Sequence, residues 1–187
     1  HVDVYYHRSL VYQQQGKLQQ AMTDVNQAMQ LDPKQVDTCY NRGLTYAQQG
    51  AYEQAIADFA QVIEANPEHA DAWYHRGIIY ADRDQVEQAI ADLSRVLELV
   101  PEYDMAWYHR GNAYQQQGKL EQAIADLGRF IELNPRHATA YHNRGNALYH
   151  RGEIEQAIAD LSRAIALNRH YVSAYYNRGN AHYHHGE

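Results

Sequence analysis

Residues 70–103 read ADAWYHRGIIYADRDQVEQAIADLSRVLELVPEY, a stretch that contains two helical patterns in succession. The first pattern predicts a helix over 72–82, because three residues share one face at spacings of four and three: Trp73, Gly77 and Tyr80. The second predicts a helix over 87–99 with its apolar residues gathered by the same rule: Ala89, Leu93, Val96 and Leu97. Asp84 lies between them, where a residue that tolerates positive φ can end a helix. Pro101 ends the second helix, because its ring disfavours helical geometry in the preceding residue.

The same hairpin pattern returns every 34 residues, and three independent series of residues have this spacing. The prolines are Pro33, Pro67, Pro101 and Pro135, and the first glycine series is Gly43, Gly77, Gly111, Gly145 and Gly179. The second glycine series, in which Asp84 fills the one gap, is Gly16, Gly50, Gly118, Gly152 and Gly186. The chain is therefore predicted to be a single array over 1–187, with repeats 2–35, 36–69, 70–103, 104–137 and 138–171 and a partial repeat 172–187.

These residues resemble the tetratricopeptide repeat family. Its pattern of Trp, Leu-Gly and Tyr followed by Ala, Phe and Pro is met by Trp73, Gly77 and Tyr80, and by Ala55, Phe59 and Pro67. The resemblance covers nearly the whole chain and implies an all-α fold, an α-solenoid (right-handed superhelix) of 34-residue helix-turn-helix units. The related pentatricopeptide repeat, which binds RNA, has a slightly longer unit and is usually basic, and neither property fits here. The chain departs from the family pattern at Ser9, at Arg169 and at the usual leucine position, which is arginine in every repeat.

The recurring arginines have a matching series of acids. The arginines are Arg8, Arg42, Arg76, Arg110, Arg144 and Arg178, and the acids are Asp24, Asp58, Asp92, Asp126 and Asp160. We expect these residues to pair between helices, within a repeat or across the joint, although two solvated charges without contact are the alternative. Exposed pairs contribute only about 0–1 kcal/mol each, so such pairs would tune the packing. A small residue in every second helix and the Gly43 series are expected to let the two helices approach closely.

Composition excludes several classes of protein. The chain has 16 Lys plus Arg against 23 Asp plus Glu, a net charge of −7, which disfavours nucleic-acid binding. Its single cysteine, Cys39, excludes an internal disulfide and is expected to be a small buried hydrophobic residue. No apolar run approaches a membrane span, so no membrane insertion is expected. Because the chain begins with His1, we expect a fragment or processed product, and the free cysteine and missing signal favour a cytoplasmic location.

The resemblance implies that the first helices line a concave groove, and helical geometry indicates which residues face it. An aromatic series runs along this face, beside histidines and asparagines that can donate and accept hydrogen bonds. Tyrosine adds a rigid apolar surface with a polar tip, which suits peptide recognition. The predicted peptide-binding residues are Tyr74, Tyr108, His109, Asn112, His142, Asn143, Asn146 and Asn177. The alternative is that these residues are hydrated helix surface.

The sequence therefore predicts a non-catalytic protein–protein interaction module that binds a partner peptide or protein segment and needs no cofactor. One alternative is a structural spacer that self-associates by end-to-end stacking. Another is the non-catalytic arm of a larger enzyme. Tail peptides with a C-terminal carboxylate, which one subclass of the family holds with lysine and arginine, are not expected to bind, because the lysine position here is Tyr108 or His142.

Two groups of residues resemble chemical sites but lack the partners that such sites need. Asp71 and His75 stand four residues apart on one helix and could form an acid–base pair, but no nucleophile or phosphate loop accompanies them. Histidines also cluster near the C-terminus, where His182 and His185 are three residues apart. Equivalent residues of neighbouring repeats are separated by roughly 10 Å, too far for one metal ion with ligands at about 2 Å. We therefore predict neither a catalytic nor a metal site.

Overall fold

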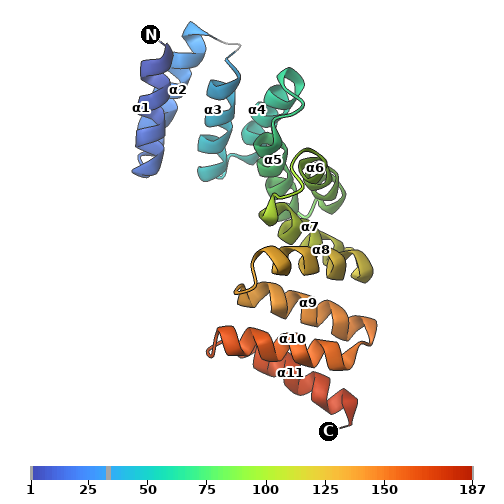
Figure 1. Ribbon diagram of the computed structural model, residues 1–187. Helices are drawn as coiled ribbons and strands as arrows, with labels where there is room; N and C mark the ends of the chain where they lie inside the picture. Colours follow the sequence, from blue (N-terminus) through green and yellow to red (C-terminus); the bar gives the residue numbers. More distant parts are fainter. Residues whose placement is uncertain (1, 33–34, 187) are drawn as a thin grey trace. The chain divides into compact units, whose positions relative to one another are not determined.

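The computed structural model describes residues 2–32 and 35–186, which form eleven α-helices and contain no strand (Figure 1). The helices are α1 (Val2–Gln14), α2 (Leu18–Leu31), α3 (Val36–Gln48), α4 (Tyr52–Ala65), α5 (Ala70–Asp82), α6 (Val86–Leu99), α7 (Asp104–Gln116), α8 (Leu120–Leu133), α9 (Ala138–Arg151), α10 (Ile154–Leu167) and α11 (Val172–His185). The hairpin predicted from residues 70–103 is α5 and α6, each within two residues of its expected bounds. The all-α fold and its helix-turn-helix units are confirmed.

The chain forms two compact units, one up to Leu99 and one from Val100. Each helix packs against the next one within its unit, so α1 to α6 follow one another in the first unit and α7 to α11 in the second. Alternate helices also touch: α1 contacts α3, α3 contacts α5, α7 contacts α9 and α9 contacts α11. The first helices of successive hairpins are therefore neighbours within each unit. This arrangement brings together side chains that are one repeat apart in the sequence.

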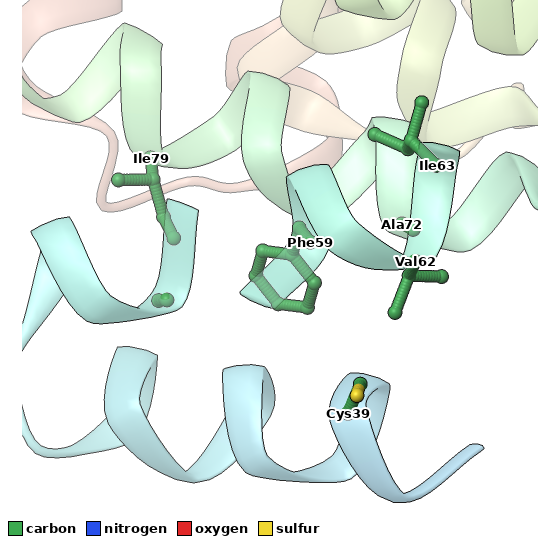
Figure 2. Close-up of a cluster of buried hydrophobic side chains, with 7 residues drawn as sticks. Cys39, Phe59, Val62, Ile63, Ala72 and Ile79 are labelled. Carbon is green, nitrogen blue, oxygen red and sulfur yellow. The ribbon is translucent and has the colours of Figure 1, made fainter. Parts of the chain in front are cut away.

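One cluster of the first unit's core lies between α3, α4 and α5 (Figure 2). Phe59 is its largest fully buried side chain, and Cys39 packs in the same cluster with 2% of its surface exposed. Burial raises the pKa of the Cys39 thiol, as expected for a cysteine that acts as a small hydrophobic residue. The alanine in the first turn of each second helix is fully buried in all five hairpins: Ala21, Ala55, Ala89, Ala123 and Ala157.

Glycine permits close helix contact at four of its five equivalent positions. A Cβ atom on Gly43 would lie 2.8 Å from the Phe59 ring, and one on Gly111 would lie 2.9 Å from Leu127 Cγ. Gly77 and Gly145 are similarly close to the second helix of their hairpins. The expectation of close approach is wrong for Gly179, where a Cβ would meet no atom within 4 Å. The described chain places no second helix against that face of α11.

Turns between the paired helices use the left-handed backbone region, as predicted. Asp84 has φ 60°, and it occupies the position that glycine fills in the other repeats. Gly152 has φ 88° and caps α9, with its backbone N–H bonded to the Tyr149 carbonyl at 3.0 Å. A residue with a short polar side chain tolerates this region better than most, which explains why aspartate can replace glycine.

One bidentate ion pair joins the two helices in each of the five hairpins. In every case the arginine Nε and one terminal nitrogen each donate to one carboxylate oxygen, at 2.6–2.9 Å. The predicted pairing is therefore confirmed, and each pair lies within a repeat: Arg8–Asp24, Arg42–Asp58, Arg76–Asp92, Arg110–Asp126 and Arg144–Asp160. The carboxylates are buried, and these hydrogen bonds raise the pKa of Arg76 and Arg144. Arg178 instead donates to the Ser162 hydroxyl at 3.2 Å.

Candidate functional site

Amide side chains from three successive first helices form a hydrogen-bonded network in the second unit. Asn143 on α9 donates from Nδ2 to Asn112 Oδ1 on α7, at 2.9 Å. Asn177 on α11 donates in the same way to Asn146 Oδ1 on α9, at 2.7 Å. Each pair joins residues 31 positions apart, three fewer than the repeat length of 34. The second residue of each pair therefore lies about one helical turn before the position equivalent to the first. The structure thus joins four of the predicted peptide-binding residues, the asparagines, in two hydrogen-bonded pairs.

His142 lies at the centre of this network. Its Nε2 atom faces two amide nitrogens, Asn177 Nδ2 at 3.0 Å and Asn146 Nδ2 at 3.3 Å. Its Nδ1 atom lies 3.2 Å from Asn143 Oδ1 and 3.3 Å from the Tyr171 hydroxyl. An amide nitrogen can only donate, so Nε2 acts as an acceptor and the ring proton is assigned to Nδ1. In this neutral tautomer the single lone pair of Nε2 is shared by the two amide donors, and the Nδ1 proton faces the Asn143 and Tyr171 oxygens.

Tyr108 completes the network on α7. Its hydroxyl lies 3.4 Å from Asn143 Nδ2, and its ring packs against Phe130, with a centroid separation of 5.0 Å. The same ring contacts His137 at 5.3 Å, and His137 caps α9 by accepting from the Ala140 N–H. We refer below to one set of residues as the amide network: Tyr108, Asn112, His142, Asn143, Asn146 and Asn177.

The other two predicted site residues lie outside this network. His109 is edge-on to Tyr108, with a centroid separation of 5.3 Å, and therefore lies at its border. Tyr74 belongs to α5 in the first unit, where its ring is edge-on to His75 at 5.3 Å. Six of the eight predicted residues thus share one network, a seventh contacts it, and Tyr74 stays a separate prediction.

In the first unit, the asparagine equivalent to Asn143 is covered by the chain's own side chains. Asn41 has only 1% of its surface exposed and donates to the Ser9 hydroxyl at 2.6 Å. Gln13 covers it from α1, donating to the Asn41 carbonyl at 3.0 Å and to the Thr45 hydroxyl. Asn41 therefore does not face an open groove, because Ser9 and Gln13 replace solvent as its neighbours.

A small pocket adjoins the amide network between α9 and α11. Its volume is about 180 Å³, and its lining residues are Asn146, Tyr149, His150, Asn177 and Asn180. Tyr149 and His150 were missed as peptide-binding candidates, although their positions three and four residues after Asn146 place them on the same helix face. Tyr171 was also missed. The sequence could have indicated this residue, because the position just before the first helix is aromatic in four repeats: His69, Tyr103, His137 and Tyr171.

Two general properties of the described residues bear on function. They contain no group of three or more histidine, cysteine, aspartate or glutamate side chains placed to hold a metal ion. None of the described helices combines the length and apolar character needed to cross a membrane.

Acidification is expected to destabilise both units through two histidines. Burial lowers the pKa of His142 and of His75, whose ring lies 5.9 Å from that of Tyr40. The charged form is therefore disfavoured in the folded chain, so stability is complete above the unfolded pKa of about 6.5. It falls as the pH drops from there through the lowered native values. Urea midpoints at about pH 7.5 and pH 5.5 check this, since the fall should shrink in the double variant His75→Gln/His142→Gln. An equal fall in this variant would contradict the assignment.

Hairpins of helix stacked in series, with the first helices lining a polar face, define a helical repeat protein. The sequence matches the family described as tetratricopeptide repeat over residues 9–72 and 59–91. It also matches the family described as TPR repeat over residues 79–118, 111–150 and 145–186. The chain therefore belongs to the tetratricopeptide repeat family.

Solved structures of similar fold include three repeat proteins. YrrB, described as a TPR protein with an unusual peptide-binding site, is 23% identical over 94% of this chain and 90% of its own, with a TM-score of 0.84. MamA from Desulfovibrio magneticus is 21% identical over 91% of this chain and 96% of its own, also with a TM-score of 0.84. A tetratricopeptide repeat protein from Parabacteroides merdae is 23% identical over 96% and 70% of the two chains, with a TM-score of 0.74. These likenesses show the shared fold. No curated protein matches the sequence.

Proposed function

We propose that the amide network is the centre of a non-catalytic site that binds an extended segment of a partner protein. The observation that carries this proposal is the repetition of one asparagine pair on successive first helices. Asn112 and Asn146 occupy equivalent positions one repeat apart, and so do Asn143 and Asn177. Neighbouring helices lie roughly 8–10 Å apart, which is the length of about three residues of an extended chain. An extended partner segment can therefore place every third peptide group next to one asparagine pair.

Some amide groups of the network remain available to form hydrogen bonds with such an extended segment. In Asn112 the network uses the amide oxygen as an acceptor, which leaves its nitrogen to donate. In Asn177 it uses both hydrogens of the nitrogen, on His142 and on Asn146, which leaves the oxygen to accept. A peptide group has one donor and one acceptor, so it complements these remaining groups. Because the protein already holds each amide in place, binding needs little further ordering.

The site carries no formal charge, which disfavours partner segments that would place a charged group there. None of the six network residues is lysine, arginine, aspartate or glutamate, and His142 is neutral in the tautomer assigned above. A carboxylate placed there would lose its hydration without gaining a cation. We therefore propose that peptides bind through their backbone and neutral side chains, and that acidic C-terminal tails do not bind. The peptide-binding site named for YrrB supports a binding role on this fold.

A random peptide library tests the proposal directly. Peptides of about twelve residues, long enough to span about 40 Å when extended, are selected on the full chain and their affinities measured by fluorescence anisotropy. The variant Asn112→Ala/Asn143→Ala removes both partners of one pair, so it should bind selected peptides at least about tenfold more weakly while its fold is kept. The control is Gln122→Ala, an exposed residue of α8. Selected peptides that bind the double variant as tightly as the native chain would place the binding surface elsewhere.

A further inference from the structure

The pocket beside the amide network is lined by neutral polar side chains that can donate and accept hydrogen bonds. Three of its five lining residues are asparagines, and the remaining two are Tyr149 and His150. Asn146 and Asn180 occupy equivalent positions in successive repeats, so their side chains approach the pocket from α9 and α11. No lysine, arginine, aspartate or glutamate lines it. Its volume of about 180 Å³ suits one side chain and is well below the roughly 300–1,000 Å³ of typical small-molecule sites.

His142 determines which atoms of Asn146 and Asn177 remain available to a ligand in the pocket. Because Nε2 accepts from Asn177 at 3.0 Å and Asn146 accepts from Asn177 at 2.7 Å, both amide hydrogens of Asn177 point into the network. Its oxygen is left as the acceptor on the pocket side. Asn146 Nδ2 lies 3.3 Å from the same Nε2 lone pair, which it shares with Asn177, and it keeps its second hydrogen. The pocket therefore has an acceptor from α11 and a donor from α9 next to each other.

We propose that this pocket binds a primary carboxamide, the side chain of a glutamine or asparagine in the partner segment. The carboxamide oxygen accepts from Asn146 Nδ2, and the carboxamide nitrogen donates to Asn177 Oδ1. Asn180 and His150 add further polar groups to the lining of the pocket. This inference rests on the proposed function, since it assigns a side chain to a segment held by the same face.

Two close analogues of glutamine do not fit. Glutamate has the same shape, but one of its oxygens would face the Asn177 oxygen, and no cation lines the pocket. Methionine fills a similar volume, but it would leave the donor of Asn146 and the acceptor of Asn177 without partners. A site built to bind a polar group rejects an analogue that lacks it far more strongly than an apolar site does. We expect glutamine to bind at least about tenfold more tightly than either analogue.

Three capped amino acids test the inference on the full chain: the N-acetyl methylamides of glutamine, glutamate and methionine. Their binding is followed by NMR through the side-chain amide signals of the 15N-labelled protein. The glutamine probe should shift the signals of Asn146, Asn177 and Asn180 in a saturable way, and the other two probes should do so only at about tenfold higher concentration or above. Equal binding of the three probes, or a response elsewhere in the chain alone, would overturn the inference.

A matched pair of variants separates this inference from the proposed function. Asn180→Leu fills the pocket and should abolish the response to glutamine, whereas Ser173→Leu, an exposed change on α11, should not. Library peptides that lose affinity in Asn112→Ala/Asn143→Ala but bind Asn180→Leu normally, with no preference for glutamine or asparagine, would leave the proposed function intact and overturn the pocket. A saturable glutamine response without any peptide binding at the network would support the pocket and refute the proposed function.

Discussion

Replacing Arg76 with methionine is expected to destabilise the first unit by about 3–5 kcal/mol. The guanidinium donates to Asp92 at 2.7 and 2.9 Å, and Asp92 has only 4% of its surface exposed. Arg76→Met leaves that carboxylate buried without its partner. It also removes the stacking of the guanidinium on Trp73, where the separation is 4.8 Å. Urea unfolding followed by circular dichroism measures the loss.

Two further variants decide whether the buried charge is the cause. Arg76→Met/Asp92→Leu removes both charges and should recover most of the stability, because replacing a whole buried ion pair with apolar groups is often close to neutral. Arg178 occupies the equivalent position in α11 but donates to the neutral hydroxyl of Ser162. Arg178→Met should therefore cost only about 1 kcal/mol. If Arg76→Met and Arg178→Met lost equal stability, the buried carboxylate would not be what makes these arginines important.

Alanine at two equivalent glycines of the second unit is expected to have effects of opposite sign. Gly111→Ala places a Cβ atom 2.9 Å from Leu127 Cγ and 3.2 Å from Asp126 Cβ, so α7 and α8 must move apart. Overpacking of this kind costs about 1–3 kcal/mol. Gly179→Ala meets no atom within 4 Å. It should stabilise α11 by up to about 1 kcal/mol, because alanine has the higher helix propensity.

The same urea experiment measures both glycine variants. Their chemical change is identical and both lie in first helices, so helix propensity alone predicts two stabilised proteins. A fall for Gly111→Ala with a rise for Gly179→Ala would show that close approach to the second helix explains the recurrence of glycine. Two shifts in the same direction would contradict the contacts described here.

Recurrence in the sequence was sufficient to predict the helical hairpins, the close-packed small residue of each second helix, Asp84 in a glycine turn and arginine–aspartate pairing between helices, although it left open whether each pair lies within a repeat. Each of these is a local property or repeats with the period of 34 residues, so every repeat adds support for the same assignment. The asparagine pairs could also be suggested, because helical geometry places Asn112, Asn143, Asn146 and Asn177 on one face.

The equivalent positions nevertheless differ in their surroundings. Gly179 faces open space while Gly111 faces Leu127, because no described helix covers that side of α11. Asn41 is buried beneath Gln13, whereas its equivalent Asn143 belongs to the amide network. A repeat pattern treats such residues alike, but their neighbours come from adjacent repeats in which the residue types have changed.

The spacing of apolar residues, prolines and glycines established that this chain is an array of helical hairpins, since helix faces and helix ends follow from local sequence. The role of His142 as an acceptor shared by two amides, and the pocket beside Asn146 and Asn177, emerged from the packing of α9 against α11. Hydrogen-bond partners are set to within a few tenths of an ångström by how neighbouring helices are shifted and rotated. Those shifts are the sum of many weak contacts between repeats, and no short pattern of residues encodes them.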